Sequence, residues 1–195
     1  PMTWHAKALA TSYVTPPGSG AHGADESETQ FPFSTASWFF LDAVEMRMPG
    51  DSFAIAAFGD SITDGTASTM NGDDRWPDVL ARRLHALHGN KIAVINAGIG
   101  GNQIAGPAEY APSKPFPGGP SARSRIERDV LELSGIATIV WLEGINDWLR
   151  PLLRNQISHS LAAINPPYVA VLQILARFDR ADEQRGQIGR LNVKP

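Results

Sequence analysis

The chain has 195 residues and is 43% hydrophobic, so it is large enough for one domain with a substantial core. Its formal net charge of −3 gives no electrostatic reason to expect nucleic acid or an anionic membrane surface as a partner. No apolar run approaches the roughly 20 residues that span a bilayer, and the absence of cysteine excludes disulfides. No spacing of side chains predicts a metal or cofactor site.

The first 50 residues predict a β-rich segment that precedes the main domain. Residues 18–29 form a polar loop that contains glycine, and residues 37–46 alternate partly like a strand. Residues 1–10 have no apolar stretch of the kind found in a signal peptide. We expect residues 1–50 to be the tail of a β-rich N-terminal segment and residues 51–195 to form the main domain.

Residues 53–65 are the most informative part of the chain. The apolar run 53–58 predicts a buried strand, and Gly59 begins a polar loop that carries Ser61. In open α/β sheets, ligands bind at the carboxyl ends of the strands. The residues alone leave three roles open for Ser61: a nucleophile, a phosphate ligand or a helix cap.

Two later segments repeat this design, each an apolar strand that runs into a loop with Gly and Asn or Asp. The expected strands are 91–97 and 136–142, their loops are 98–102 and 143–147, and amphipathic helices are expected over 75–88 and 124–133. Alternation of strand and helix predicts a parallel sheet with right-handed crossovers, and hence an α/β fold. The three polar loops are then expected along one edge of the sheet.

These loops resemble the motif blocks of the GDSL/SGNH hydrolase family of serine esterases and lipases. The matching residues are Gly59-Asp60-Ser61 in the first loop, the region of Gly101 in the second, and Gly144-Ile145-Asn146-Asp147 in the third. The resemblance covers roughly the middle half of the chain. It implies a three-layer α/β/α sandwich with a parallel, flavodoxin-like sheet, whose C-terminal part is truncated or divergent here.

The resemblance also implies a role for each matching residue. Ser61 would attack an ester carbonyl, and the oxyanion would be bound by the N–H groups of Ser61 and Gly101 and by the side-chain amide of Asn146. The residues that would support the site are Gly59, Asp60 and Asp147. The implied substrates are small-molecule or carbohydrate esters with short acyl or acetyl groups, without a cofactor, and a secreted or cell-envelope location fits the family.

This sequence lacks the motif that supplies the general base in the family. In the family the base is the histidine of a late Asp-x-x-His block, and this sequence contains no Asp-x-x-His. His159 is the one histidine after the third loop, and no acid stands three residues before it, which favours a surface or structural role over that of a base. The catalytic histidine and its acid are therefore unassigned, and we expect weak or no hydrolysis of activated esters.

The C-terminal residues 149–195 are atypical of the family. Residues 168–178 are apolar enough for a buried strand or a buried helix, whereas the residues after them are polar and have no clear period. We expect the amino-acid sequence to be truncated, or translated in a shifted reading frame, beyond about residue 148.

The sequence also leaves two alternatives open. One is a non-catalytic remnant of the family that keeps the fold and binds an ester or acyl group without turnover. The other is a flavodoxin-like binding module, because residues 61–69 are rich in hydroxyl groups, although the charges of Asp60 and Asp64 would repel a phosphate there. A solvated or turn-forming role is favoured for Asp64, and Asn146 with Asp147 also fits an ordinary turn.

Overall fold

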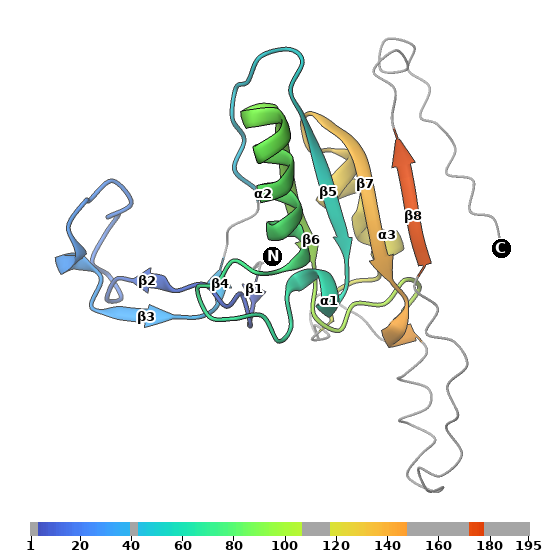
Figure 1. The fold of residues 1–195 in the computed structure, drawn as a ribbon. Helices are drawn as coiled ribbons and strands as arrows, with labels where there is room; N and C mark the ends of the chain where they lie inside the picture. Colours follow the sequence, from blue (N-terminus) through green and yellow to red (C-terminus); the bar gives the residue numbers. More distant parts are fainter. Residues whose placement is uncertain (1–3, 40–42, 107–117, 148–171, 178–195) are drawn as a thin grey trace, which may run out of the picture.

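The computed structural model describes residues 4–39, 43–106 and 118–147, and residues 172–177 as backbone alone. Its centre is a four-stranded sheet with the strand order β6-β5-β7-β8 (Figure 1). The strands are β5 (Phe53–Gly59), β6 (Ile92–Gly98), β7 (Ile136–Glu143) and β8 (Leu172–Arg177). Strand β5 pairs in parallel with both β6 and β7, whereas β8 pairs with β7 in the antiparallel direction.

The bounds of the three parallel strands agree with the sequence-based expectation to within one residue. The prediction of a parallel sheet is confirmed for these strands. Strand β8 lies within residues 168–178, where the sequence left a strand or a helix open, and it adds an antiparallel edge that the sequence did not predict. Hydrophobic periodicity predicts whether a segment is a strand but not the direction in which that strand joins a sheet.

One face of the sheet packs against a helical segment made of α3 (Ala122–Ile126) and the π-helical turn η3 (Glu127–Leu131). The core on this face is formed by buried residues of β5, β7 and the two helical turns: Ala56, Phe58, Ile139, Trp141, Ala122 and Val130. The ring of Phe58 meets that of Trp141 edge to face, with the centroids 5.4 Å apart. Such aromatic pairs stabilise a core by about 1 kcal/mol beyond the area that they bury.

The other face of the sheet is covered by α2 (Trp76–His88), which is followed by the short helix η2 (Gly89–Lys91), and α1 (Ser61–Asp64) lies just past the carboxyl end of β5. Figure 1 shows α2 on one side of the sheet and α3 on the other. Both α1 and α2 contact β6. The expected layering of helix, sheet and helix is therefore confirmed.

Capping residues explain where the two long helical segments begin. The N-cap of α2 is Arg75, whose backbone N–H donates to the Asp78 carboxylate over 3.1 Å, so the helix starts one residue later than expected. The N-cap of α3 is Ser121, whose hydroxyl accepts from the N–H of Ser124 over 3.3 Å. The helical segment therefore begins at Ala122, two residues before the expected start, and it ends at Leu131.

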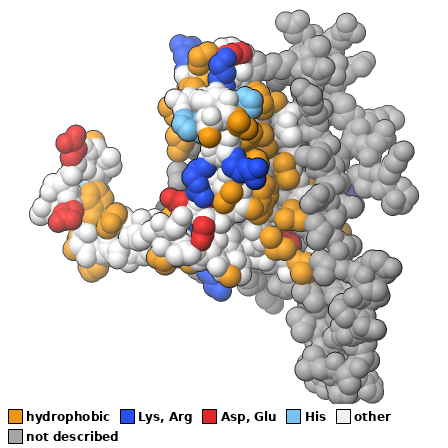
Figure 2. All heavy atoms as spheres, in the orientation of Figure 1, with side chains coloured by type: hydrophobic (Ala, Val, Ile, Leu, Met, Phe, Trp, Pro, Cys, Tyr) orange, Lys and Arg blue, Asp and Glu red, His pale blue; other side chains and the backbone are white. Residues whose placement is uncertain are grey.

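The N-terminal residues form two small antiparallel pairs outside the main sheet. Strand β1 (Trp4–His5) pairs with β4 (Trp38–Phe39), and β2 (Ser12–Val14) pairs with β3 (Phe33–Thr35), with the short helix η1 (Glu28–Gln30) between β2 and β3. Figure 2 shows hydrophobic side chains on the surface of this region. The strand expected within residues 37–46 is thus limited to Trp38–Phe39 in the described part of that range, and the division of the chain at residue 50 stays a prediction.

Two features are absent from the part of the chain that the structure describes. None of its helices has the length and apolar character needed to cross a membrane. Nor does it contain a group of three or more acidic or histidine side chains placed to hold a metal ion.

Gly59, the last residue of β5, lies too close to its neighbours for any side chain. A Cβ atom at this position would overlap the carbonyl oxygen of Leu142 on β7 and the hydroxyl of Thr63 on α1. Because Leu142 contributes a backbone atom of a paired strand, the clash cannot be relieved by rotating a side chain. The close approach of β5 to β7 and α1 therefore depends on glycine here.

We expect Gly59→Ala to lower the free energy of unfolding by about 3 kcal/mol, the upper part of the usual range for overpacking. Gly50→Ala is the matched control, because a Cβ at Gly50 would have nothing within 4 Å. Urea unfolding of the two variants and the wild type measures the difference. Equal stability of the two variants would contradict the close packing at Gly59.

Candidate active site

The three polar loops leave the same edge of the sheet. Gly59 at the end of β5 stands opposite Gly98 at the end of β6 and opposite Leu142 near the end of β7. Because the three strands run in parallel, the residues after them continue on one side of the molecule. The expectation that the loops share one edge is confirmed, whereas the convergence of Ser61, Gly101 and Asn146 on a single point stays a prediction.

Asp60, and not Ser61, is the cap of α1. The Asp60 Oδ1 atom accepts from the backbone N–H of Ile62 over 3.0 Å, and Ser61 is the first residue of the helix. The helix ends at Asp64 and is followed by its C-cap, Gly65, which adopts a φ of +110°. The cap interpretation of Ser61 is therefore wrong, because Asp60 already supplies the capping oxygen. Within the described residues, the Ser61 hydroxyl has no hydrogen-bond partner.

Asp60 is buried, with 1% of its surface exposed, so it is not a solvated loop acid. Burial raises the pKa of its carboxyl; the N–H of Ile62 opposes this rise, and the nearby charge of Asp147 adds to it. The second carboxylate oxygen, Oδ2, is buried and has no partner among the described residues. Asp60 is therefore a buried residue that holds the start of α1 through its bond to the Ile62 N–H.

Asp64 is also not the solvated acid or simple turn former that the sequence favoured. Its side chain is 14% exposed and accepts two hydrogen bonds from distant parts of the chain. Oδ1 accepts from Nδ1 of His5 and Oδ2 accepts from the N–H of Gly100, each over 3.1 Å. Position within the motif did not reveal these contacts, because both partners are distant in sequence.

The second loop, Gly98 to Asn102, contacts both of its neighbours. The N–H of Ile99 donates to the carbonyl of Gly59 over 3.0 Å, and that of Gly100 donates to Asp64. Gly101 has a φ of +81°, which favours glycine because a side chain is strained there. Gly101 is thus held between Gly100, which contacts α1, and Asn102, which contacts the third loop.

Among the described residues, four hydrogen bonds join the third loop to the second loop and to the three residues that follow it. Nδ2 of Asn146 donates to the carbonyl of Asn102 over 2.9 Å, and Nε2 of Gln103 donates to the carbonyl of Asn146 over 2.8 Å. The Asp147 carboxylate accepts from the N–H groups of Ile104 and Ala105, over 2.8 and 3.2 Å. Asn146 and Asp147 therefore do more than form a turn, since together they fix the third loop against the second.

Arg125 of α3 connects the ends of β5 and β6 from below. Its Nη2 donates to the carbonyl of Gly59 over 2.9 Å, its Nη1 donates to the carbonyl of Ala97 over 2.8 Å, and its Nε donates to Oδ1 of Asn102 over 2.8 Å. Nδ2 of Asn102 in turn donates to two backbone carbonyls, those of Gly118 and Pro120, each over 2.7 Å. One guanidinium thus fixes the exits of two strands and the end of the second loop.

The charge of Arg125 is compensated although the residue is only 1% exposed. Nη1 lies 3.2 Å from the Asp129 carboxylate one turn later, and the guanidinium lies over the Phe58 ring, 4.0 Å from its centroid. Burial lowers the pKa of the Arg125 guanidinium, and the negative charges of Glu143 and Asp129 oppose that effect. These interactions offset the cost of burying the positive charge of Arg125.

Glu143, the last residue of β7, is a second buried acid beneath the loops. Burial raises its pKa to about 7, against the opposing effects of the Trp141 indole N–H and the Arg125 charge. The indole N–H donates to Oε2 over 2.8 Å, whereas Oε1 is buried without a partner among the described residues. Near neutral pH, Glu143 is therefore partly protonated.

The described histidines do not reach Ser61. His85 and His88 lie in the last turn of α2, and neither they, His5 nor His22 forms a hydrogen bond with the Ser61 hydroxyl. His5 bonds to Asp64, and His22 bonds to Asp25. His159 lies outside the described residues, so its role as a base stays untested.

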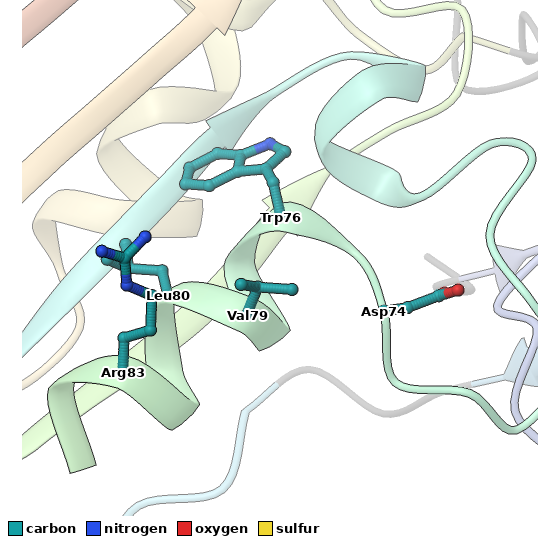
Figure 3. Close-up of a pocket in the computed structure, with 5 residues that line it drawn as sticks. All are labelled: Asp74, Trp76, Val79, Leu80 and Arg83. Atoms are coloured by element: carbon teal, nitrogen blue, oxygen red, sulfur yellow. The ribbon is translucent and has the colours of Figure 1, made fainter. Parts of the chain in front are cut away.

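An open hollow of about 390 Å³ lies on α2, and none of the residues assigned by the resemblance lines it. Its lining residues are Asp74, Trp76, Val79, Leu80 and Arg83. Figure 3 shows that Asp74 comes from the loop before α2 and that Val79 and Arg83 come from the helix. Without a nucleophile, this hollow offers no chemistry for ester cleavage.

The sequence missed several residues that build the site. Arg125 looked like one of several charges on an amphipathic helix, although Asp129 stands four residues later, the spacing of a helical ion pair. Asn102, Gln103 and Glu143 lie next to recognised motif residues, yet only the fold brings them into contact with their partners. His5 gave no signal, because its partner Asp64 is 59 residues away.

Comparison with known proteins gives one family match. Residues 57–185 match the model of the GDSL-like lipase/acylhydrolase family. The chain is similar to the crystal structure of AlinE4, an SGNH-hydrolase family esterase, at 26% identity and a TM-score of 0.38, covering 53% of this chain and 46% of that one. A mutant of the same esterase matches at 27% identity with the same TM-score and coverage. The chain therefore spans about half the length of these solved structures, and no curated protein matches it.

We expect Arg125→Met to lower the free energy of unfolding by about 3–5 kcal/mol, because the buried Oδ1 of Asn102 and the carbonyls of Gly59 and Ala97 each lose a charged donor. Arg123→Met on the same helix is the control, since Arg123 is exposed, and it should change stability by less than about 0.5 kcal/mol. Thermal or urea unfolding measures both. Similar losses in the two variants would contradict the central role of the Arg125 guanidinium.

The raised pKa of Glu143 predicts a loss of stability with rising pH. The folded state binds this proton more tightly than the unfolded chain does, so the free energy of unfolding falls as the pH rises from about 4.5 to about 7. This group alone accounts for a fall of about 3 kcal/mol. Urea unfolding at pH 5 and pH 8 should show a smaller fall in Glu143→Gln than in the wild type. Glu132→Gln, at an exposed position, should retain the full fall, and an unchanged slope in Glu143→Gln would refute the assignment.

Proposed function

Because the chain belongs to the GDSL-like lipase/acylhydrolase family, we propose that its site is that of a serine hydrolase acting on carboxylic esters with short acyl groups, acetyl and carbohydrate esters among them. The observation that supports this most directly is the shared edge of the three motif loops. The first loop bonds to the second through Gly59 and Asp64, and the third bonds to the second through Asn146. No metal or cofactor is required for this chemistry.

Ser61 is the proposed nucleophile. It is the first residue of α1, directly after the carboxyl end of the central strand, and it is partly exposed. Its hydroxyl is not used by the described fold, since Asp60 caps the helix instead. Attack by Oγ on an ester carbonyl would form a bond to carbon and place a negative charge on the former carbonyl oxygen.

Three N–H donors are proposed to bind that oxyanion. The Ser61 N–H belongs to the first turn of α1, where helical hydrogen bonding leaves donors free. The second donor is the backbone N–H of Gly101, which lies in the second loop, Gly98 to Asn102. Nδ2 of Asn146 carries two hydrogens, and the bond to the Asn102 carbonyl uses only one of them. Loss of one such donor typically raises the barrier by about 3 kcal/mol.

The general base limits the proposed activity. A serine hydroxyl is a poor nucleophile until a base accepts its proton, and no described histidine bonds to Ser61. Oxyanion donors alone retain about 10³-fold catalysis over water in serine enzymes. We therefore propose weak turnover of esters with good leaving groups. The second candidate function is binding of an ester or acyl group without turnover, because no described histidine bonds to the Ser61 hydroxyl to activate it.

The structure disfavours a phosphate site in the first loop. A phosphate would need the free N–H groups at the start of α1, and the Asp60 carboxylate already occupies the N–H of Ile62. Asp64 adds a second acidic side chain at the other end of this short helix. The flavodoxin-like alternative therefore has no observation in its favour beyond the hydroxyl-rich loop.

We expect the wild-type chain to hydrolyse an aryl acetate slightly faster than buffer, and Ser61→Ala to reduce that rate to the buffer rate. Ser68→Ala is the matched control in the same loop and should keep the wild-type rate. Initial rates of aryl alcohol release measure all three. A rate unaffected by Ser61→Ala would place the activity elsewhere, and robust Ser61-dependent turnover would show that the chain contains a base.

A further inference from the structure

The N-terminal strands lie against the loop that follows Ser61, and three separate contacts join them. His5 on β1 bonds to Asp64, and the ring of Trp38 on β4 lies 5.5 Å from the guanidinium of Arg75. Asn71, at a φ of +57°, bonds to the backbone of residues 9 and 11. Figure 1 shows β1 and β4 beside α1. The N-terminal residues are therefore packed on the first motif loop at its start, middle and end.

Asp64 joins this N-terminal region to the second motif loop. Its two carboxylate oxygens accept from different parts of the chain, Oδ1 from His5 and Oδ2 from the Gly100 N–H. The His5 side chain is 21% exposed and that of Asp64 is 14% exposed, so water screens the pair only in part. The backbone of Gly100 lies close to this carboxylate, since a Cβ built at Gly100 would lie 3.3 Å from Asp64 Oδ2.

The bond from His5 restricts the rotation of the Asp64 carboxylate. A carboxylate held through one oxygen presents the other in a fixed direction, here toward the Gly100 N–H. The His5 ring is itself placed by strand pairing with Trp38 and by an edge-on contact with the Trp38 ring, with the centroids 6.4 Å apart. Gly100 directly precedes Gly101, so its orientation sets the direction of the next peptide group.

We propose that His5 is a positioning residue for the candidate active site, acting through Asp64 to fix Gly100 and the loop that presents the Gly101 N–H. The effect of His5 on catalysis rests on the proposed function. The effect of His5 on the position of Gly100 does not, because it can be measured without turnover. The N-terminal segment is then part of the site and not only a neighbour of it.

The test measures hydrogen exchange of the Gly100 amide by NMR in the full chain. His5→Ala should speed Gly100 exchange about fivefold, the effect of losing a typical net hydrogen-bond contribution, while exchange of the Val140 amide in β7 stays the same. His5→Asn keeps an N–H donor near the position of Nδ1 and should restore slow exchange. The matched control is His22→Ala, which removes another histidine–aspartate pair and should leave Gly100 unchanged.

A double variant separates positioning through Asp64 from a direct effect of His5. Asp64→Ala should speed Gly100 exchange at least as much as His5→Ala, and the double variant should equal Asp64→Ala alone. Additive effects, no change at Gly100 in His5→Ala, or an equal change at Val140 would each overturn the proposal. The Val140 result also detects variants that are simply less well folded.

Turnover of an aryl acetate provides the catalytic comparison. His5→Ala should lower kcat about fivefold and change KM by less than twofold, because the oxyanion loop acts mainly in the transition state. If the wild type shows no Ser61-dependent turnover, the proposed function fails while the amide measurements still decide the positioning of Gly100. A rise in KM at constant kcat would refute a role in orienting the oxyanion loop.

Discussion

The structure depends above all on the buried guanidinium of Arg125. Its N–H groups donate to the fully buried side chain of Asn102, to the carbonyl of Gly59, which also accepts from Ile99, and to the carbonyl of the half-buried Ala97. A guanidinium offers five N–H groups in a rigid plane, so one side chain can satisfy all three. Because two of these oxygens end the parallel strands, the same bonds that satisfy the core also fix the start of two motif loops.

This arrangement places several charges in a confined space below the loops. Asp60, Glu143 and Asp147 each carry a carboxyl there, and their mutual repulsion adds to the burial that raises the pKa values of Asp60 and Glu143. Arg125 offsets part of that repulsion. A chain that lacked the guanidinium would lose both the hydrogen bonds to these oxygens and the positive charge near the acids, so one substitution would remove both effects together.

The loops above this base are held by contacts that cross long stretches of sequence. Asp64 connects the N-terminal strands with the second loop, and Asn146 and Asp147 connect the second loop with the third. None of these bonds uses the Ser61 hydroxyl, which has no hydrogen-bond partner among the described residues. The described part of the chain thus holds the three polar loops together, and none of its histidines forms a hydrogen bond with the Ser61 hydroxyl.

The sequence by itself determined the three parallel strands to within one residue, the alternation with helices, and the loops that carry Ser61, Gly101 and Asn146, because these follow from local apolar periodicity and from glycine in turns. It assigned Asp64 to solvent or a turn, missed Arg125 and His5, and did not predict the antiparallel direction of β8. Only the tertiary structure decided these points. Burial and hydrogen bonding between residues such as His5 and Asp64, 59 positions apart, depend on how distant segments pack, and no local pattern records that.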